Sequence, residues 1–124
     1  MIAPAQPNFN EFAKALGSVV NFSAGQVLFR ELDPPRFIYF ILKGSVELSI
    51  HGRVVATINE GDAVGLLSLI DDQPRTVSAR ALEECELALL DKKKFRYMVE
   101  EIPNFVWFVF AELGARLRAA NALI

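Results

Sequence analysis

Two glycines, a short apolar segment, a proline and an arginine lie close together between Glu60 and Ala81. Gly65 directly precedes the apolar segment Leu66–Ile70, which is long enough for a helical turn. Glycine has no Cβ, so the backbone there can closely approach another group. The first N–H groups of a helical turn lack intrahelical partners and attract anions. Arg75 opens the next extended segment, and a guanidinium can bind an anion through two N–H groups. This spacing predicts a phosphate-binding site.

The composition favours a single domain with an ordinary core. The chain has 124 residues, of which 52% are hydrophobic and 23% charged, and its formal net charge is −2. Residues 1–90 carry 7 basic and 11 acidic side chains (net −4), and residues 91–124 carry 6 and 4 (net +2). Such a chain has no basic stripe for nucleic acid. An anionic ligand would be held by local groups.

Several classes of function are disfavoured by what the chain contains. One cysteine, Cys85, excludes an internal disulfide, and one histidine, His51, excludes a metal site built from several imidazoles. Cys85 is expected to fill space in the core, since no histidine in the pattern would activate it. We therefore expect no enzyme, no metal and no resident cofactor. The apolar segment Phe105–Phe110 is too short to span a bilayer, and no secretory leader is recognisable, so a cytoplasmic location is expected.

Short apolar segments separated by turn residues predict a β-rich middle of the chain. The expected strands are Gln26–Leu32, Phe37–Leu42, Ser45–His51, Val54–Ile58, Arg75–Leu82 and Glu86–Leu90. Ser45–His51 alternates most clearly between apolar and polar residues, and Gly52-Arg53 is expected to turn it into a hairpin. Short strands at this spacing are typical of an antiparallel sandwich or barrel. We place this barrel at about residues 20–90.

Helical patterns flank the strands. Asn8 is expected to cap a short helix ending near Gly17, with an apolar face made of Phe9, Phe12, Ala13 and Leu16. Asp91 is expected to cap a second helix that runs to about Ile102, with Phe95, Met98, Val99 and Ile102 on its apolar face. Pro103 ends it. The C-terminal helices thus occupy about residues 91–124.

The last helix, Asn104–Ile124, is apolar on two sides. One side has heptad spacing and consists of Val106, Phe110, Leu113, Leu117, Ala120 and Ile124. The other, with Phe105, Phe108 and Val109, is expected to pack on the barrel. Two apolar sides need two partners, so we predict a homodimer formed through this helix. The alternative is one helix folded only onto its own barrel.

These features together resemble the cyclic nucleotide-binding domain family over nearly the whole chain. The family's phosphate-binding cassette reads approximately F-G-E-L-A-L, then a few residues, then P-R-T/A-A. Here Val64–Leu69 reads V-G-L-L-S-L and Pro74–Val77 reads P-R-T-V. The glycines near other strands and the final helix pair also fit; these are Gly25, Gly44, Gly61 and the segment from Phe95 to Leu117. The resemblance implies a mainly β fold: a jelly-roll barrel with a short N-terminal helix and two C-terminal helices.

The resemblance also implies a role for particular residues. Arg75 would pair with the cyclic phosphate of cyclic AMP or cyclic GMP. The cassette around Gly65 and Pro74 would supply backbone N–H groups at Leu67, Ser68 and Thr76, together with the Thr76 hydroxyl. The last helix would cover the base, where Ala120 and Asn121 occupy the positions of a polar Thr-Ser pair in the bacterial catabolite-activator branch. Asn121 keeps a donor and an acceptor for a purine edge.

Leu66 is the main departure from the family, because it replaces the cassette glutamate that accepts the ribose 2′-hydroxyl. Losing that acceptor should weaken binding by roughly 1.5–3 kcal/mol, or about 10- to 150-fold. Two interpretations stay open: a stand-alone sensor of a cyclic nucleotide or related phosphate ligand, and a domain that binds no nucleotide and serves as a dimerisation or interaction module. A weaker third is a transcription regulator acting through a separate DNA-binding partner, since the helix-turn-helix of DNA-binding relatives does not follow within this chain.

Overall fold

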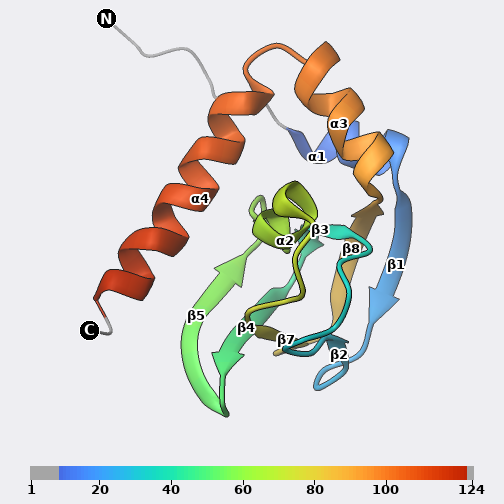
Figure 1. Cartoon of the computed structure of the whole chain (residues 1–124). Helices are drawn as coiled ribbons and strands as arrows, with labels where there is room; N and C mark the ends of the chain where they lie inside the picture. The colour runs from blue at the N-terminus through green and yellow to red at the C-terminus, as the bar shows by residue number, and fades with distance from the viewer. Residues whose placement is uncertain (1–8, 123–124) are drawn as a thin grey trace, which may run out of the picture.

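The structure is a computed structural model that describes residues 9–122 (Figure 1). Its helices are α1 (Phe9–Leu16), α2 (Leu66–Asp71), α3 (Lys92–Glu101) and α4 (Phe105–Asn121). Its strands are β1 (Ser18–Phe22), β2 (Val27–Phe29), β3 (Ile38–Lys43), β4 (Ser45–Ile50), β5 (Arg53–Asn59), β6 (Ala63–Val64), β7 (Ser78–Ala81) and β8 (Cys85–Leu90). The expected Asn8 cap and Ile124 lie outside the described residues.

The strands form two four-stranded antiparallel sheets. Their orders are β1-β8-β3-β6 and β2-β7-β4-β5, and every pairing is antiparallel. The predicted jelly-roll fold with flanking helices is confirmed, but the two sheets are not closed into a continuous barrel. β1 and the two-residue β6 were not predicted. β1 has four exposed residues out of five, so it lacks the apolar alternation that marks a half-buried strand.

All six predicted strands are present, and three of them, β2, β4 and β7, are shorter than predicted. β2 ends at Phe29 because Leu32 adopts a left-handed conformation, with φ 73°, which an extended strand does not allow. The predicted hairpin is present, but its turn is His51-Gly52 and not Gly52-Arg53. Ile50 pairs with Arg53, and both turn residues have positive φ, as a type I′ turn requires.

The core has two parts, separated by the sheet that contains β3. Tyr39 and Ile41 on one face of β3 join the cluster between the sheets, whereas Ile38, Phe40 and Leu42 on the other face join a cluster under the helices. Five of the six β3 residues are buried as a result. Strands covered on both faces read as continuous apolar runs, which explains the sequence I-Y-F-I-L. This double coverage anchors the sheet from which the cassette segment emerges.

The helices close one end of the molecule. The Asp91 carboxylate caps α3 by accepting a hydrogen bond from the Lys94 N–H at 2.9 Å, as predicted. In α1 the buried residues are Phe9 and Ala13, but Phe12 is 44% exposed, because it lies at the edge of the apolar face. The first turns of α4 pack against α1 and β3 through stacked and edge-on phenylalanine rings. From there α4 runs alongside the body of the molecule toward β5 (Figure 1).

Candidate ligand-binding site

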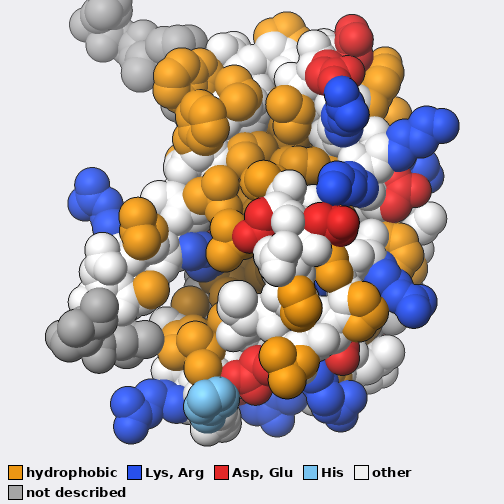
Figure 2. All heavy atoms as spheres, in the orientation of Figure 1, with side chains coloured by type: hydrophobic (Ala, Val, Ile, Leu, Met, Phe, Trp, Pro, Cys, Tyr) orange, Lys and Arg blue, Asp and Glu red, His pale blue; other side chains and the backbone are white. Residues whose placement is uncertain are grey.

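A cavity of about 460 Å³ lies between the cassette segment, the β4–β5 hairpin and α4. We call it the pocket. It is lined by Phe29, Leu48, Ile50, Val55, Ala56, Ala63, Val64, Gly65, Leu66, Leu67, Ser68, Arg75, Thr76, Val77, Glu112, Leu113, Arg116, Leu117, Ala119 and Ala120. Figure 2 shows a hollow with mainly apolar walls on this face of the molecule. Its volume is in the range of small-molecule sites.

Gly65 sits where only glycine fits. It precedes α2 with φ 90° and ψ 13°, a left-handed conformation. A Cβ at this position would lie 2.7 Å from Arg75 Nη1 and 3.1 Å from the Phe37 carbonyl oxygen. The predicted close approach of the backbone to another group is therefore present. The group is the arginine of the same cassette.

Arg75 lies at the base of the pocket and is only 3% exposed. Its Nη1 donates to the Gly65 carbonyl at 2.8 Å, and its Nη2 donates to the Phe37 carbonyl. The guanidinium carbon lies 4.1 Å from the centre of the Phe29 ring, a cation–π contact. Burial lowers the pKa of Arg75 from its ordinary value, while neighbouring Tyr39 and Asp33 act in the opposite direction. The guanidinium is thus fixed in place before any ligand arrives.

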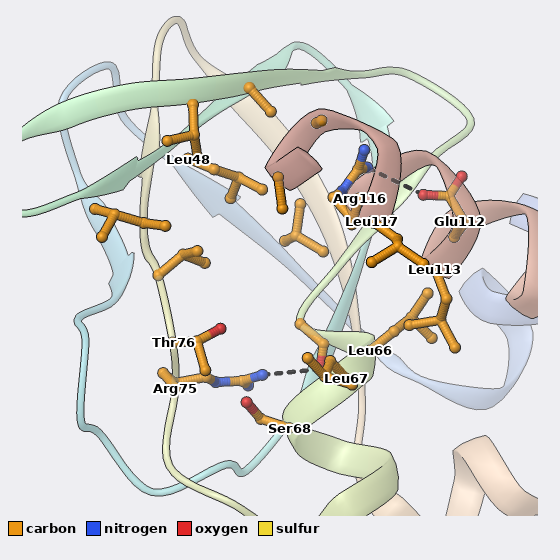
Figure 3. Close-up of a pocket in the computed structure, with 18 of the residues that line it drawn as sticks. Leu48, Leu66, Leu67, Ser68, Arg75, Thr76, Glu112, Leu113, Arg116 and Leu117 are labelled. Atoms are coloured by element: carbon orange, nitrogen blue, oxygen red, sulfur yellow. Dashed lines mark hydrogen bonds and ion pairs between the residues drawn. The ribbon is translucent and has the colours of Figure 1, made fainter. Parts of the chain in front are cut away.

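The Nε of Arg75 is buried and has no hydrogen-bond partner in the structure of residues 9–122. A buried charged N–H without a partner is costly, and a group that could accept from it would be stabilised there. Arg75 and Thr76 lie together at one end of the pocket, with Leu113 and Leu117 of α4 across from them (Figure 3).

Of the predicted ligand-binding residues, all but Pro74 and Asn121 line the pocket. Leu66 is 5% exposed and Leu67 is 52% exposed, and both line it. Ser68 is buried, and its hydroxyl donates to the Pro74 carbonyl at 3.3 Å, which holds the cassette turn closed. Pro74 is therefore structural here and does not line the pocket. Asn121, which was expected to contact the purine, is not among the residues that line the pocket, whose last lining residue on α4 is Ala120.

Two charged residues of α4 were missed by the sequence reasoning. Glu112 and Arg116 line the pocket and form an ion pair with a distance of 3.1 Å between Glu112 Oε2 and Arg116 Nη2. Their spacing of four residues signals such a pair, but it does not say which side of the helix faces the ligand. The spacing of Leu113 and Leu117 likewise does not show what their side of the helix faces. Both were assigned to the dimer seam, and in the structure both line the pocket.

Glu112 is a buried acid whose charge is disfavoured. Burial is the main cause that raises its pKa to about 8, followed by a hydrogen bond with the Asp62 carboxyl group and the charge of Asp62. The cation of Arg116 and a hydrogen bond from the Ala63 backbone lower the pKa in part. The neutral form of Glu112 is therefore favoured more than in an exposed carboxyl group. The hydrogen bond between Glu112 and Asp62 joins α4 to the loop between β5 and β6.

Other residues singled out in the sequence have structural positions. Cys85 is 2% exposed, with its Sγ 3.2 Å from the carbonyl oxygens of Ser45 and Glu83, and burial raises the pKa of the thiol. Its role as core filler is consistent with this. His51 is exposed in the hairpin turn. Within residues 9–122 no three metal-ligating side chains cluster, and no helix there is long and apolar enough to cross a bilayer.

The sequence model for the cyclic nucleotide-binding domain matches residues 19–101, which is more than half of the chain. The chain belongs to this family. The crystal structure of the Thermus thermophilus catabolite activator protein is similar, with a TM-score of 0.79 and 26% identity, covering 94% of this chain and 57% of that one. The second cyclic nucleotide-binding domain of a protein kinase A regulatory subunit shares the fold, with a TM-score of 0.78 at 19% identity, covering 96% of this chain and 80% of that one.

Two relatives match this chain over part of a longer protein. The Pycsar effector protein XpPycTIR of Xanthomonas perforans is 31% identical over 111 residues, 89% of this chain and 37% of the relative. The cAMP-activated global transcriptional regulator CRP of Escherichia coli is 27% identical over 106 residues, 81% of this chain and 50% of the relative. The chain thus spans half or less of these relatives. It is similar to their sensing domain, a module of regulatory type.

Proposed function

We propose that this domain is a non-catalytic sensor that binds a cyclic nucleotide, cyclic AMP or cyclic GMP, or a related phosphate ligand in the pocket. The phosphate would lie against the Arg75 guanidinium, with backbone N–H groups of Leu67, Ser68 and Thr76 around it. The observation that carries the proposal is Arg75, a buried cation that lines one end of an open cavity. The ligand would supply a negative charge beside this cation.

The signal would pass to α4. Residues Glu112 to Ala120 of this helix form one wall of the pocket, so a bound ligand contacts the cassette and the helix at the same time. On its outer side, Trp107 is 66% and Phe110 is 55% exposed. Large apolar side chains that are exposed together are typical of a protein–protein interface, and we propose a homodimer formed through α4. Neither nucleic acid nor membrane is proposed as a direct partner.

A second candidate function is a dimerisation or interaction module that binds no nucleotide. Two observations favour it. Both Nη atoms of Arg75 already donate to backbone carbonyls, and Leu66 offers a ribose hydroxyl no acceptor. A buried hydroxyl without a partner costs on the order of 1–3 kcal/mol. The two candidates share the homodimer and differ in the ligand.

Calorimetric titration with cyclic AMP and with cyclic GMP separates them. The wild type should bind one of these nucleotides, and Arg75→Gln should lose most of that affinity. Arg80→Gln is the matched control, because Arg80 is exposed on β7 and does not line the pocket. Leu66→Glu should raise affinity by about 10- to 150-fold by restoring an acceptor. If neither the wild type nor any variant gives binding heat at millimolar nucleotide, the sensor proposal fails, and the dimerisation or interaction module remains as the candidate function.

The dimer is tested by sedimentation equilibrium of the wild type and of Phe110→Glu. A carboxylate on the exposed side of α4 should shift a dimer toward monomer. The control is Tyr97→Glu on α3, where the replaced aromatic residue is 52% exposed. A wild type that remains monomeric at high concentration contradicts this part of the proposal.

A further inference from the structure

The walls of the pocket are apolar on three sides. β4 and β5 contribute Leu48 and Val55, the cassette contributes Leu66 and Leu67, and α4 contributes Leu113 and Leu117. These side chains have no hydrogen-bonding atoms. A ligand group that faces them gains from burial in proportion to its apolar area, whereas a hydroxyl or amine turned toward them loses its water without replacement.

The polar side chains of the lining are mostly engaged with the protein itself. The Ser68 hydroxyl donates to the Pro74 carbonyl, and Glu112 and Arg116 pair with each other at 3.1 Å. Arg75 uses two of its five N–H donors on backbone carbonyls, and the residue is 3% exposed. The positive charge of Arg75, which lies at one end of the cavity, favours an anion there (Figure 3).

We propose that the pocket selects amphiphilic anions: molecules with one anionic group and an apolar body, such as a medium-chain carboxylate. The anionic group lies at Arg75 and Thr76, and the body extends past Leu66 toward Leu113 and Leu117. The inference rests on the proposed function in one respect, that this pocket is the ligand site. It goes further by assigning the character of the ligand body, which these side chains determine.

Leu66 is the residue that decides the selection. Since it is 5% exposed, it forms part of the wall and cannot turn away into solvent. A ribosyl body places a hydroxyl on this end of a cyclic nucleotide, and the leucine accepts nothing from it. An alkyl body places methylene groups there and buries them. The same side chain therefore weakens a ribosyl ligand and strengthens an apolar one.

The test is calorimetry of the full 124-residue chain with decanoate, 1-decanol and cyclic AMP, each below the concentration at which it aggregates. Decanoate should bind, and more tightly than cyclic AMP. Decanol has the same chain without the charge and should bind about 10- to 150-fold more weakly, the value of a charge-assisted hydrogen bond. Decanoate and cyclic AMP should displace one another if both bind.

Leu66→Glu should reverse the order of the two ligands, weakening decanoate and strengthening cyclic AMP. Because a buried substitution can impair folding, Leu67→Glu is the second variant: Leu67 lines the pocket but is 52% exposed. It should weaken decanoate by about 10-fold or more through repulsion of the anion and lost apolar contact. Leu82→Glu, the same change at a 40%-exposed residue outside the lining, should leave binding unchanged.

The outcomes distinguish a failure of the selection for apolar bodies from a failure of the sensor proposal. If cyclic AMP binds and decanoate does not, the selection for apolar bodies is wrong and the sensor proposal stands. If decanol binds as tightly as decanoate, the anionic group has no role and the inference is overturned. If decanoate binds and cyclic AMP does not, the inference stands and the nucleotide is not the ligand. If neither binds, both fail.

Discussion

In the first half of α4, Phe105 is 0% exposed and Val109 is 4% exposed, and both belong to the cluster under the helices. In the second half, Leu117 is 62% exposed although it lines the pocket. One continuous helix thus has one end built into the core and another end held by few contacts. Glu112, buried and paired with Asp62 and Arg116, lies between them.

This difference has a consequence for signalling. A segment with few buried contacts changes position at small cost in free energy, whereas a core segment does not. A ligand in the pocket would add apolar contacts to the second half of α4 alone. The first half then serves as a fixed support, and the binding free energy of the ligand is available to order the end that lines the pocket. Three predictions test whether the halves differ in this way.

The largest effect is expected at Phe105. Its ring contacts those of Phe9, Phe40, Phe95 and Phe108, with centroid distances from 5.2 to 6.0 Å. Phe105→Ala should lower the free energy of unfolding by about 3–5 kcal/mol, because it leaves a cavity in the core. Urea denaturation followed by circular dichroism measures this.

The matched change in the second half is Leu117→Ala. With 62% of the residue exposed, the free energy of unfolding should change by about 0.5 kcal/mol or less. Comparable losses for the two variants would mean that α4 is uniformly integrated into the core, and the comparison would fail.

The sequence could predict the supported half of α4 but not the exposed one. Phe105, Phe108 and Val109 share a helix face, and their burial follows from periodicity. The spacing of Leu113 and Leu117 fits a heptad seam as well as it fits a pocket wall, because helical periodicity shows which residues share a face but not what that face contacts. The cassette was easier to predict, because Gly65 signals a backbone conformation that needs glycine and Arg75 supplies a positive charge for an anion. Turn chemistry and alternation predicted the strands other than β1 and β6, and the resemblance to the family supplied the jelly-roll fold.

The Arg75 hydrogen bonds were beyond prediction for a related reason. Its partners are the carbonyls of Gly65 and Phe37, and the second of these is 38 residues away along the chain. Backbone carbonyls carry no sequence signal. The buried pairing of Glu112 with Asp62 was likewise hidden, because two acids at distant positions read as ordinary solvated charges. Only the packing of α4 on the β5–β6 loop brings them together.

The second prediction concerns Glu112 at the boundary. Its pKa in the folded protein, about 8, lies above the ordinary value of 4.5, so the folded state binds the proton more tightly. The resulting stabilisation is full below pH 4.5 and is lost as pH rises through 8. Glu112→Gln keeps an N–H donor for Asp62 but cannot titrate. The wild type should therefore lose stability relative to the variant by up to about 1.4 kcal/mol per pH unit in this window.

Thermal unfolding from pH 5 to pH 9 measures the two profiles. Glu101→Gln, an exposed position on α3, should follow the wild type throughout. Parallel profiles for the wild type and Glu112→Gln would show that the acid is ionised in the folded state, and that α4 is not joined to the Asp62 loop through a shared proton.

The smallest effect is expected at Gly114, in the interior of the second half of α4. A Cβ built there meets nothing within 4 Å, so no contact requires glycine. Gly114→Ala should stabilise the helix by about 0.5–1 kcal/mol, since glycine loses more conformational entropy on folding than alanine. Ala111→Gly, the reverse change at an exposed position one turn earlier, should destabilise it by a similar amount.

Amide hydrogen exchange locates this effect along the helix. If the second half opens on its own, residues after Gly114 exchange faster than those around Phe105 and Val109 in the wild type, and Gly114→Ala slows the exchange only there. A local opening also costs ligand affinity, because binding must first order the helix. The alanine variant should then bind ligand more tightly by up to about 5-fold, the same 0.5–1 kcal/mol expressed as affinity. Equal protection in both halves of the wild type would instead make α4 a single rigid unit, with the pocket complete before the ligand arrives.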